Sequence, residues 1–165
     1  MKNKFINRRS ELAFFNRSWS ARSPQLVVLY GRRRVGKTAL LRRFAEGRPA
    51  FHYMATRLPE AQQLRELGQG LGLLVDDPLL ADSGFQSWDQ VFTWVSRQKR
   101  RVAFMIDEFP YLVEANRALP SLLQRAWDQE LGDSKTFMVL CGSSVAVMER
   151  EVLSERAPLY GRRTG

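Results

Sequence analysis

Short runs of apolar residues alternate along the chain with stretches in which apolar positions recur every three or four residues. The short runs predict β-strands over 26–30, 51–54, 101–106 and 136–141. The periodic stretches predict helices over 38–46, 59–71, 88–98, 119–131 and 144–153. Such alternation is typical of an α/β domain with a mainly parallel sheet. The strands 101–106 and 136–141 are almost continuously apolar, as expected for central strands covered on both faces.

Breaks in the pattern predict where the regular structure ends. Gly68, Gly70 and Gly72 are poor helix formers, so we expect them to weaken the end of the helix over 59–71. The stretch 76–84 combines aspartates with a proline and a glycine, and we expect a loop there. The sequence contains no repeat and no long linker, so we predict one domain over residues 1–165.

Composition sets limits on the class of protein. With 165 residues, 44% hydrophobic and 26% charged, the chain can build the core of one globular domain. No apolar stretch approaches the ~20 residues needed to cross a bilayer, and the start lacks the apolar core of a secretory signal. The single cysteine, Cys141, lies in an apolar run and is expected to be buried. We therefore expect a cytoplasmic protein without a membrane partner.

The charge balance favours anionic partners. The net charge is +9 and the isoelectric point is about 10.4, which suits nucleotides, nucleic acids or acidic proteins. It does not choose among them. Neither paired Cys/His zinc ligands nor an aromatic RNA-binding box is present, and many arginines fall on predicted helices, as on solvated faces.

The segment after the first strand reads Gly-Arg-Arg-Arg-Val-Gly-Lys-Thr and fits the phosphate-binding pattern G-x-x-x-x-G-K-[ST] at every fixed position. Glycines let the loop point its backbone N–H groups inward, and the following helix adds the positive end of its dipole. The lysine can reach the β- and γ-phosphates, and the threonine hydroxyl can be a Mg²⁺ ligand. The residues expected to bind the nucleotide are Gly31, Arg32, Arg33, Arg34, Val35, Gly36, Lys37, Thr38 and Ala39.

Two carboxylates, Asp107 and Glu108, follow the apolar strand 101–106. In parallel sheets ligands collect at this end of the strands, beside the phosphate loop. We expect Asp107 to hold Mg²⁺ together with Thr38, and Glu108 to orient the water that attacks the γ-phosphate. A carboxylate aimed at water favours hydrolysis over transfer to a metabolite. Lys37 and Glu108 are therefore the predicted catalytic residues.

Further candidates follow the last strand. Ser143 can sense the γ-phosphate or hold the attacking water, and Ser144 can cap the next helix, although either serine suits either task. Arg162 or Arg163 can supply positive charge to the transition state; the alternative is an ordinary basic turn. We predict Ser143 and Arg162 as additional catalytic residues.

Together these motifs resemble the archaeal-type ATPase family, P-loop NTPases related to the STAND and AAA+ ATPases. The segments that carry the resemblance are 5–12, 30–38, 106–112, 141–144 and 158–164. The resemblance implies a three-layer αβα fold with strand order 5-1-4-3-2, ATP and Mg²⁺ as ligands, and a segment near residues 5–8 at the base of the fold. Family members continue into a fifth strand, a helical lid region and a C-terminal winged-helix or nuclease-like part.

The final residues, 157–165, look like an unfinished loop, so we expect a longer protein and no fifth strand within this chain. The strand before the phosphate loop would then lie at an open sheet edge. The predicted function is an ATP-binding, Mg²⁺-dependent ATPase that acts as a nucleotide switch for a C-terminal effector. Two kinds of partner are left open. One is DNA or a protein effector, engaged through the C-terminal part, and the other is further copies of the chain in a homo-oligomer. The alternative functions are a nucleic-acid-binding module with a vestigial nucleotide site and a small-molecule P-loop kinase.

Overall fold

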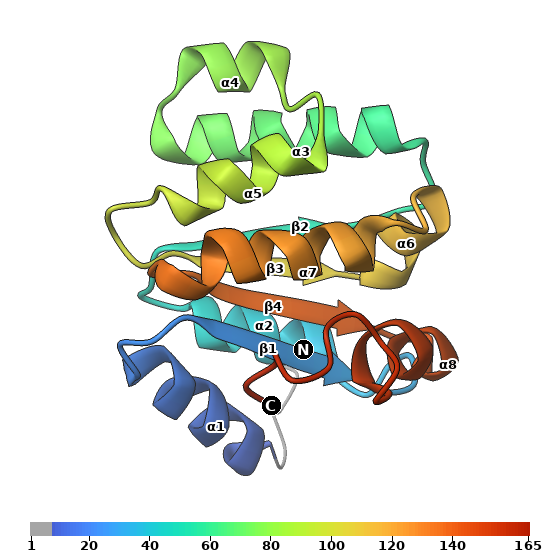
Figure 1. Ribbon diagram of the computed structural model, residues 1–165. Coiled ribbons are helices and arrows are strands. Elements are labelled where there is room, and N and C mark those ends of the chain that lie inside the picture. Colours follow the sequence, from blue (N-terminus) through green and yellow to red (C-terminus); the bar gives the residue numbers. More distant parts are fainter. Residues whose placement is uncertain (1–7) are drawn as a thin grey trace.

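A computed structural model describes residues 8–165, and in this part of the chain a four-stranded parallel sheet lies between two layers of helices (Figure 1). The strands are β1 (Gln25–Tyr30), β2 (Ala50–Met54), β3 (Ala103–Asp107) and β4 (Phe137–Gly142). The helices are α1 (Arg9–Ser20), α2 (Lys37–Ala45), α3 (Glu60–Val75), α4 (Pro78–Ser83), α5 (Trp88–Ser96), α6 (Phe109–Ala115), α7 (Leu119–Gln129) and α8 (Val145–Met148). A 3-10 turn, η1 (Leu131–Asp133), follows α7, and a π-helical turn, η2 (Glu149–Leu153), follows α8.

The predicted α/β class and its three-layer arrangement are confirmed. The sheet order is β1-β4-β3-β2, which is the expected order 5-1-4-3-2 without its fifth strand. All of the predicted strands are present, with ends that differ by one or two residues from the expected ones. Because every pairing is parallel, the carboxyl ends of β1, β3 and β4 meet at one edge.

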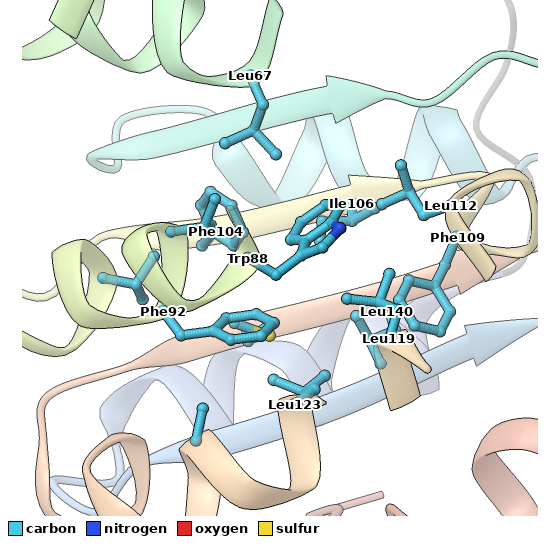
Figure 2. Packing of buried hydrophobic residues seen from close by; sticks show 14 of the residues in the cluster. Leu67, Trp88, Phe92, Phe104, Ile106, Phe109, Leu112, Leu119, Leu123 and Leu140 are labelled. Carbon is cyan, nitrogen blue, oxygen red and sulfur yellow. The ribbon is translucent and has the colours of Figure 1, made fainter. Parts of the chain in front are cut away.

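Alternate side chains of the central strands fill two separate cores. In β3, Phe104 and Ile106 pack under α3, α5 and α7, as Figure 2 shows. The intervening Met105 packs on the opposite face of the sheet, against α1 and α2. Every residue of β3 and β4 is buried, which explains why both strands read as continuous apolar runs.

The prediction of a loop over 76–84 is wrong, because residues 78–83 form α4. Asp77 caps this helix by accepting hydrogen bonds from the N–H groups of Leu79 and Leu80, both at 3.1 Å, and Pro78 occupies the first turn. The glycines do not end α3, which continues to Val75. A Cβ built on Gly72 would lie 2.2 Å from the backbone N of Ala81, so the glycine lets α3 and α4 pack backbone to backbone.

Two further helices, α1 and α6, were not predicted, and the expected helix over 144–153 is divided into α8 and η2. Part of the expected N-terminal segment, residues 5–7, lies outside the described residues. None of the helices within residues 8–165 has the length and apolar character needed to cross a membrane.

The expectation of an open edge at β1 needs correction. Thr164 N–H donates to the Leu26 carbonyl at 2.7 Å, and Leu26 N–H donates to the Thr164 hydroxyl at 3.2 Å. Val28 N–H donates to a Gly165 oxygen at 2.8 Å. Residues 164–165 thus run parallel to β1 and form hydrogen bonds with part of the backbone at its outer edge.

Candidate functional site

The loop between β1 and α2 curls around a buried lysine. Gly31 and Gly36 have φ values of 146° and 83°, which a residue with a Cβ adopts only with strain. Lys37 is 6% exposed, and its ammonium group donates to the carbonyls of Gly31 at 2.7 Å and Arg32 at 2.9 Å. Within this loop Arg32, Arg33, Arg34 and Val35 are exposed, and Arg8 donates a hydrogen bond to the Val35 carbonyl. The loop therefore places one cation inside its curve and keeps its variable side chains outside.

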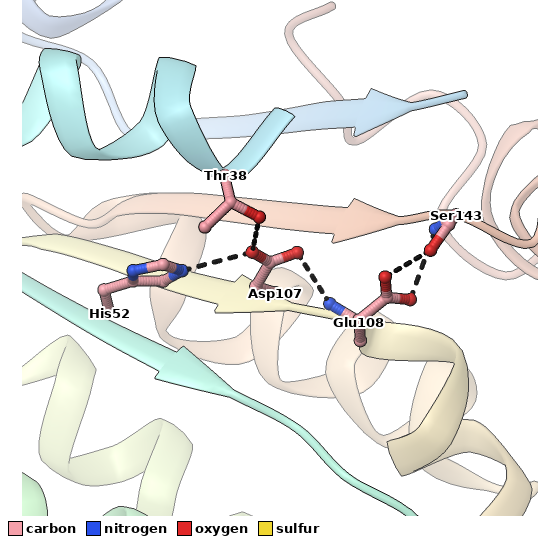
Figure 3. A network of polar contacts seen from close by, with 5 residues as sticks. All are labelled: Thr38, His52, Asp107, Glu108 and Ser143. Carbon is pink, nitrogen blue, oxygen red and sulfur yellow. Dashed lines mark hydrogen bonds and ion pairs between the residues drawn. The ribbon is translucent and has the colours of Figure 1, made fainter. Parts of the chain in front are cut away.

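Asp107, at the end of β3, connects α2, the helix after the phosphate loop, to the centre of the sheet (Figure 3). Its Oδ2 accepts a hydrogen bond from the Thr38 hydroxyl at 2.7 Å and lies 3.3 Å from His52 Nε2, while its Oδ1 accepts from Glu108 N–H at 3.0 Å. Burial alone would raise the pKa of this carboxyl, but the hydrogen bonds from His52, Thr38 and Cys141 outweigh it and lower the pKa to about 2. Asp107 is therefore ionised at neutral pH although it is only 1% exposed.

Thr38 and Asp107 offer oxygen donors of the kind that Mg²⁺ prefers. Within residues 8–165 no group of three or more His, Cys, Asp or Glu side chains could enclose a metal ion. Mg²⁺ usually takes one or two protein ligands and completes its shell with water and substrate phosphates. The donor set suits the expected ion.

Glu108 turns the chain from β3 into α6. Its φ is 56°, in the left-handed region, and its carbonyl accepts a hydrogen bond from Tyr111 N–H at 2.9 Å. The carboxylate reaches across to the end of β4, where it accepts hydrogen bonds from the Ser143 hydroxyl and from Ser143 N–H, the latter at 3.3 Å. The structure thus brings Ser143 to Glu108, as Figure 3 shows. Ser144 stands at the N-cap position of α8, but its side chain makes no capping hydrogen bond.

A cavity of about 500 Å³ opens beside Glu108 and Ser143. Its other walls come from α6, from the α8–η2 segment and from three further arginines: Arg33 of the phosphate loop, Arg57 after β2 and Arg117 after α6. Arg33 donates to the Tyr111 hydroxyl at 2.8 Å, which links the phosphate loop to α6. The cavity gives solvent and small groups access to the Glu108 carboxylate.

The predicted arginines lie elsewhere. Arg162 forms a two-pronged ion pair with Asp128 of α7, with N–O distances of 2.9 and 2.8 Å, and also donates to the Tyr160 carbonyl at 3.1 Å. Arg163 lies over the Tyr160 ring, 5.8 Å from its centre. Neither arginine lines the cavity beside Glu108. In this conformation Arg162 fastens the C-terminal segment to α7, and its catalytic role stays a prediction.

Comparison with protein families identifies the family of the chain. The model of a family described as an ATPase domain predominantly from Archaea matches residues 5–165. The chain belongs to this family. It is also similar, with 32% identity over 161 residues, to an uncharacterised protein of Methanocaldococcus jannaschii, covering 98% of this chain and 34% of that protein. A second protein of the same organism, described as an uncharacterised ATP-binding protein, is 50% identical over 44 residues, which are 27% of this chain and 75% of that protein.

Two solved structures have the same fold as this chain. The Walker-type ATPase of Pyrococcus abyssi superposes with a TM-score of 0.67 at 21% identity, over 97% of this ATPase domain and 52% of that chain. The Orc1 protein of Aeropyrum pernix, solved in complex with DNA, gives a TM-score of 0.62 at 19% identity, over 96% and 44% of the two chains. The domain thus spans about half of these chains and about a third of its longer Methanocaldococcus relative.

His52 contacts Asp107 and was not predicted from the sequence of this ATPase domain. His52 lies in β2, and the register of β2 against β3 pairs Met54 with Asp107 and so brings His52 beside that carboxylate. Its one available signal was its rarity: it is the single histidine of the chain, in an otherwise apolar strand that follows the phosphate-loop helix.

Proposed function

We propose that this ATPase domain binds ATP together with Mg²⁺ and hydrolyses it. One observation carries the proposal: the 2.7 Å contact between the Thr38 hydroxyl and the Asp107 carboxylate. It joins the first turn after the phosphate loop to the carboxyl end of β3, where P-loop ATPases hold the metal between a hydroxyl and a carboxylate. Lys37 and Glu108 flank this contact along the same edge of the sheet.

Binding uses the loop and the start of α2. The N–H groups of residues 31–39 and the positive end of the α2 dipole are suited to phosphate oxygens. Lys37 exchanges its two carbonyl partners for oxygens of the β- and γ-phosphates, which is a favourable exchange because those oxygens are charged. Thr38 and Asp107 would hold Mg²⁺, which neutralises charge on the phosphates when it is bound.

Hydrolysis depends on Glu108. Its carboxylate borders the cavity that solvent can enter, and it can orient a water molecule and accept its proton while the oxygen attacks the γ-phosphorus. The bond to the β-phosphate oxygen breaks, and ADP and inorganic phosphate are the products. Ser143 holds the same carboxylate, so we infer that it positions Glu108 and exchanges this hydrogen bond when the γ-phosphate is present.

We further propose that the nucleotide state controls an effector that lies C-terminal to this domain in the whole protein. The greater length of the relatives supports this, and the DNA complex of the Aeropyrum Orc1 protein makes DNA one candidate for the target of that effector. Arg162 would stabilise the negative charge of the transition state if the effector, or a second copy of the chain, displaced it from Asp128. The buried, unpaired Cys141 supports action in a reducing compartment such as the cytoplasm.

Binding of Mg-ATP by the wild-type domain and by Lys37→Ala tests the first step. Lys135→Ala is the matched control, because Lys135 is an exposed lysine just before β4, at the opposite end of the sheet from the site. We expect the Lys37 substitution to weaken binding at least about tenfold, since a charge-assisted contact worth about 1.5 to 3 kcal/mol is lost. The control should bind like wild type. Equal affinities of all three proteins would refute the proposed site.

A further inference from the structure

One stretch of this basic domain carries only acidic charges. Residues 66–96 contain the carboxylates Glu66, Asp76, Asp77, Asp82 and Asp89 and no lysine or arginine, although the whole chain carries a net charge of +9. These residues form most of α3 and all of α4 and α5. The local charge of this stretch is therefore negative, although Arg65 and Arg97 border it.

The same stretch exposes large aliphatic side chains. Leu73, Leu74, Val75 and Leu79 are 78%, 51%, 40% and 82% exposed, and they follow one another from the end of α3 into the first turn of α4. We call these four residues, with Asp76, Asp77 and Asp82, the acidic–aliphatic face. Single exposed leucines are common on protein surfaces, but an apolar group rimmed by charge marks an interaction site. Leu73 and Leu79 in particular leave most of their surface in solvent.

A groove of about 560 Å³ adjoins the face between α4 and α5. Leu80, Phe85 and Trp94 contribute apolar side chains to it, and Asp77 and Asp89 contribute carboxylates. Asp89 also pairs with Arg125 of α7 at 3.0 Å, and Arg97 lines the groove, so its charge is most negative near Asp77. Leu79 belongs both to the groove and to the acidic–aliphatic face. The two together form one continuous apolar surface with an acidic border.

We propose that this surface binds an amphipathic helix of a partner protein, with apolar side chains in the groove and lysines or arginines facing the aspartates. Helices commonly dock in this way, through apolar residues at helical spacing. The carboxylates repel the phosphates of nucleic acids and the headgroups of anionic membranes, so charge complementarity selects a basic protein segment. α3 runs back from the carboxyl ends of the strands, so its exposed end lies away from the phosphate loop (Figure 1). The interaction is thus separate from the nucleotide site.

The test uses a fluorescent model peptide of ~18 residues, long enough for about five helical turns, with leucine on one face and lysine on the other. A second peptide with glutamate in place of lysine is the control for charge. Fluorescence anisotropy then measures the affinity of each peptide for the wild-type domain, for Leu73→Ser/Leu79→Ser and for Asp76→Asn/Asp82→Asn. Tyr160→Ser is the control variant, because Tyr160 is an exposed apolar residue, 42% accessible, outside the face. Circular dichroism verifies that each variant is folded.

We expect the lysine peptide to bind the wild-type domain and the Tyr160 variant equally, with or without Mg-ATP. Each double variant should weaken binding at least about tenfold, since both apolar and charged contacts contribute. The glutamate peptide should bind the wild-type domain more weakly than the lysine peptide, because its carboxylates face the aspartates. Lysine-peptide binding that is unchanged in both double variants would overturn the proposal. A second result would also overturn it: the lysine peptide does not bind, and sedimentation shows a wild-type dimer that Leu73→Ser/Leu79→Ser converts to a monomer. The surface would then be occupied by a second copy of the chain.

Discussion

Replacing Gly72 by alanine tests the packing that builds α4 and the acidic–aliphatic face. In an ordinary helix interior this change stabilises a protein by about 0.5 to 1 kcal/mol, because glycine loses more backbone entropy on folding. Here the new Cβ would lie 2.2 Å from the Ala81 N and 2.6 Å from the Ala81 Cα, and backbone atoms cannot rotate away. Overpacking of this kind costs about 1 to 3 kcal/mol. Since the contact is far inside van der Waals distance, we expect the cost to exceed the gain.

The expected net effect is a loss of about 1 to 2 kcal/mol, which corresponds to a Tm lowered by about 3 to 8 °C in a domain of this size. Gly70→Ala is the matched control in the same helix, because its Cβ would meet only ring atoms of Phe51, at 3.0 and 3.2 Å, and that side chain can shift. We expect its Tm to stay the same or rise by a few degrees. Thermal unfolding followed by circular dichroism gives both values. A Gly72→Ala protein at least as stable as Gly70→Ala would refute this description of the α3–α4 contact.

Three other predictions concern stability and reactivity. Since the pKa of Asp107 is lowered from 3.8 to about 2, its ionised form stabilises the fold by about 2 kcal/mol above about pH 4, and this contribution disappears as the pH falls towards 2. In urea unfolding, the free energies of unfolding of wild type and Asp107→Asn should therefore converge in that pH window. A difference in free energy that stays constant with pH would contradict this prediction. Arg162→Ala should lower stability by about 0.5 to 1 kcal/mol, and a double-mutant cycle with Asp128→Asn should show that the two changes are not additive. Burial and the neighbouring Asp107 raise the pKa of the Cys141 thiol, so a thiol-specific disulfide reagent should label it only after unfolding; rapid labelling of the folded protein would refute its burial.

The sequence was informative wherever chemistry restricts the residue type. The phosphate loop, the apolar strand before Asp107 and Glu108, and the alternation of strands and helices predicted both the layers and the edge where the site lies. Lys37 and Thr38 could be placed because a strand, a glycine loop and a helix follow one another without interruption. Ser143 was predicted only from its place after the last strand, and its contact with Glu108 arises because β3 and β4 are neighbours.

Contacts that depend on distant segments could not be predicted in this way. The Asp and Gly residues within 76–84 indicate a loop when the sequence is read locally. The helix α4 packs there because Gly68 and Gly72 let its backbone and the residues after it approach α3 closely. His52 reaches Asp107 only through the register of β2 against β3. The ion pair of Arg162 with Asp128 joins residues that no local pattern connects. In each case the deciding interaction is tertiary.

Phosphate release from Mg-ATP by the wild-type domain and by Glu108→Gln, with nucleotide binding measured in both, tests the central claim most directly. Glutamine keeps the size of the side chain and a hydrogen bond to Ser143, but it cannot accept a proton from water. We expect the variant to bind Mg-ATP like wild type and to lose turnover by about a hundredfold or more. Turnover at the wild-type rate in the variant would contradict the role of Glu108 and, with it, the proposed mechanism of hydrolysis.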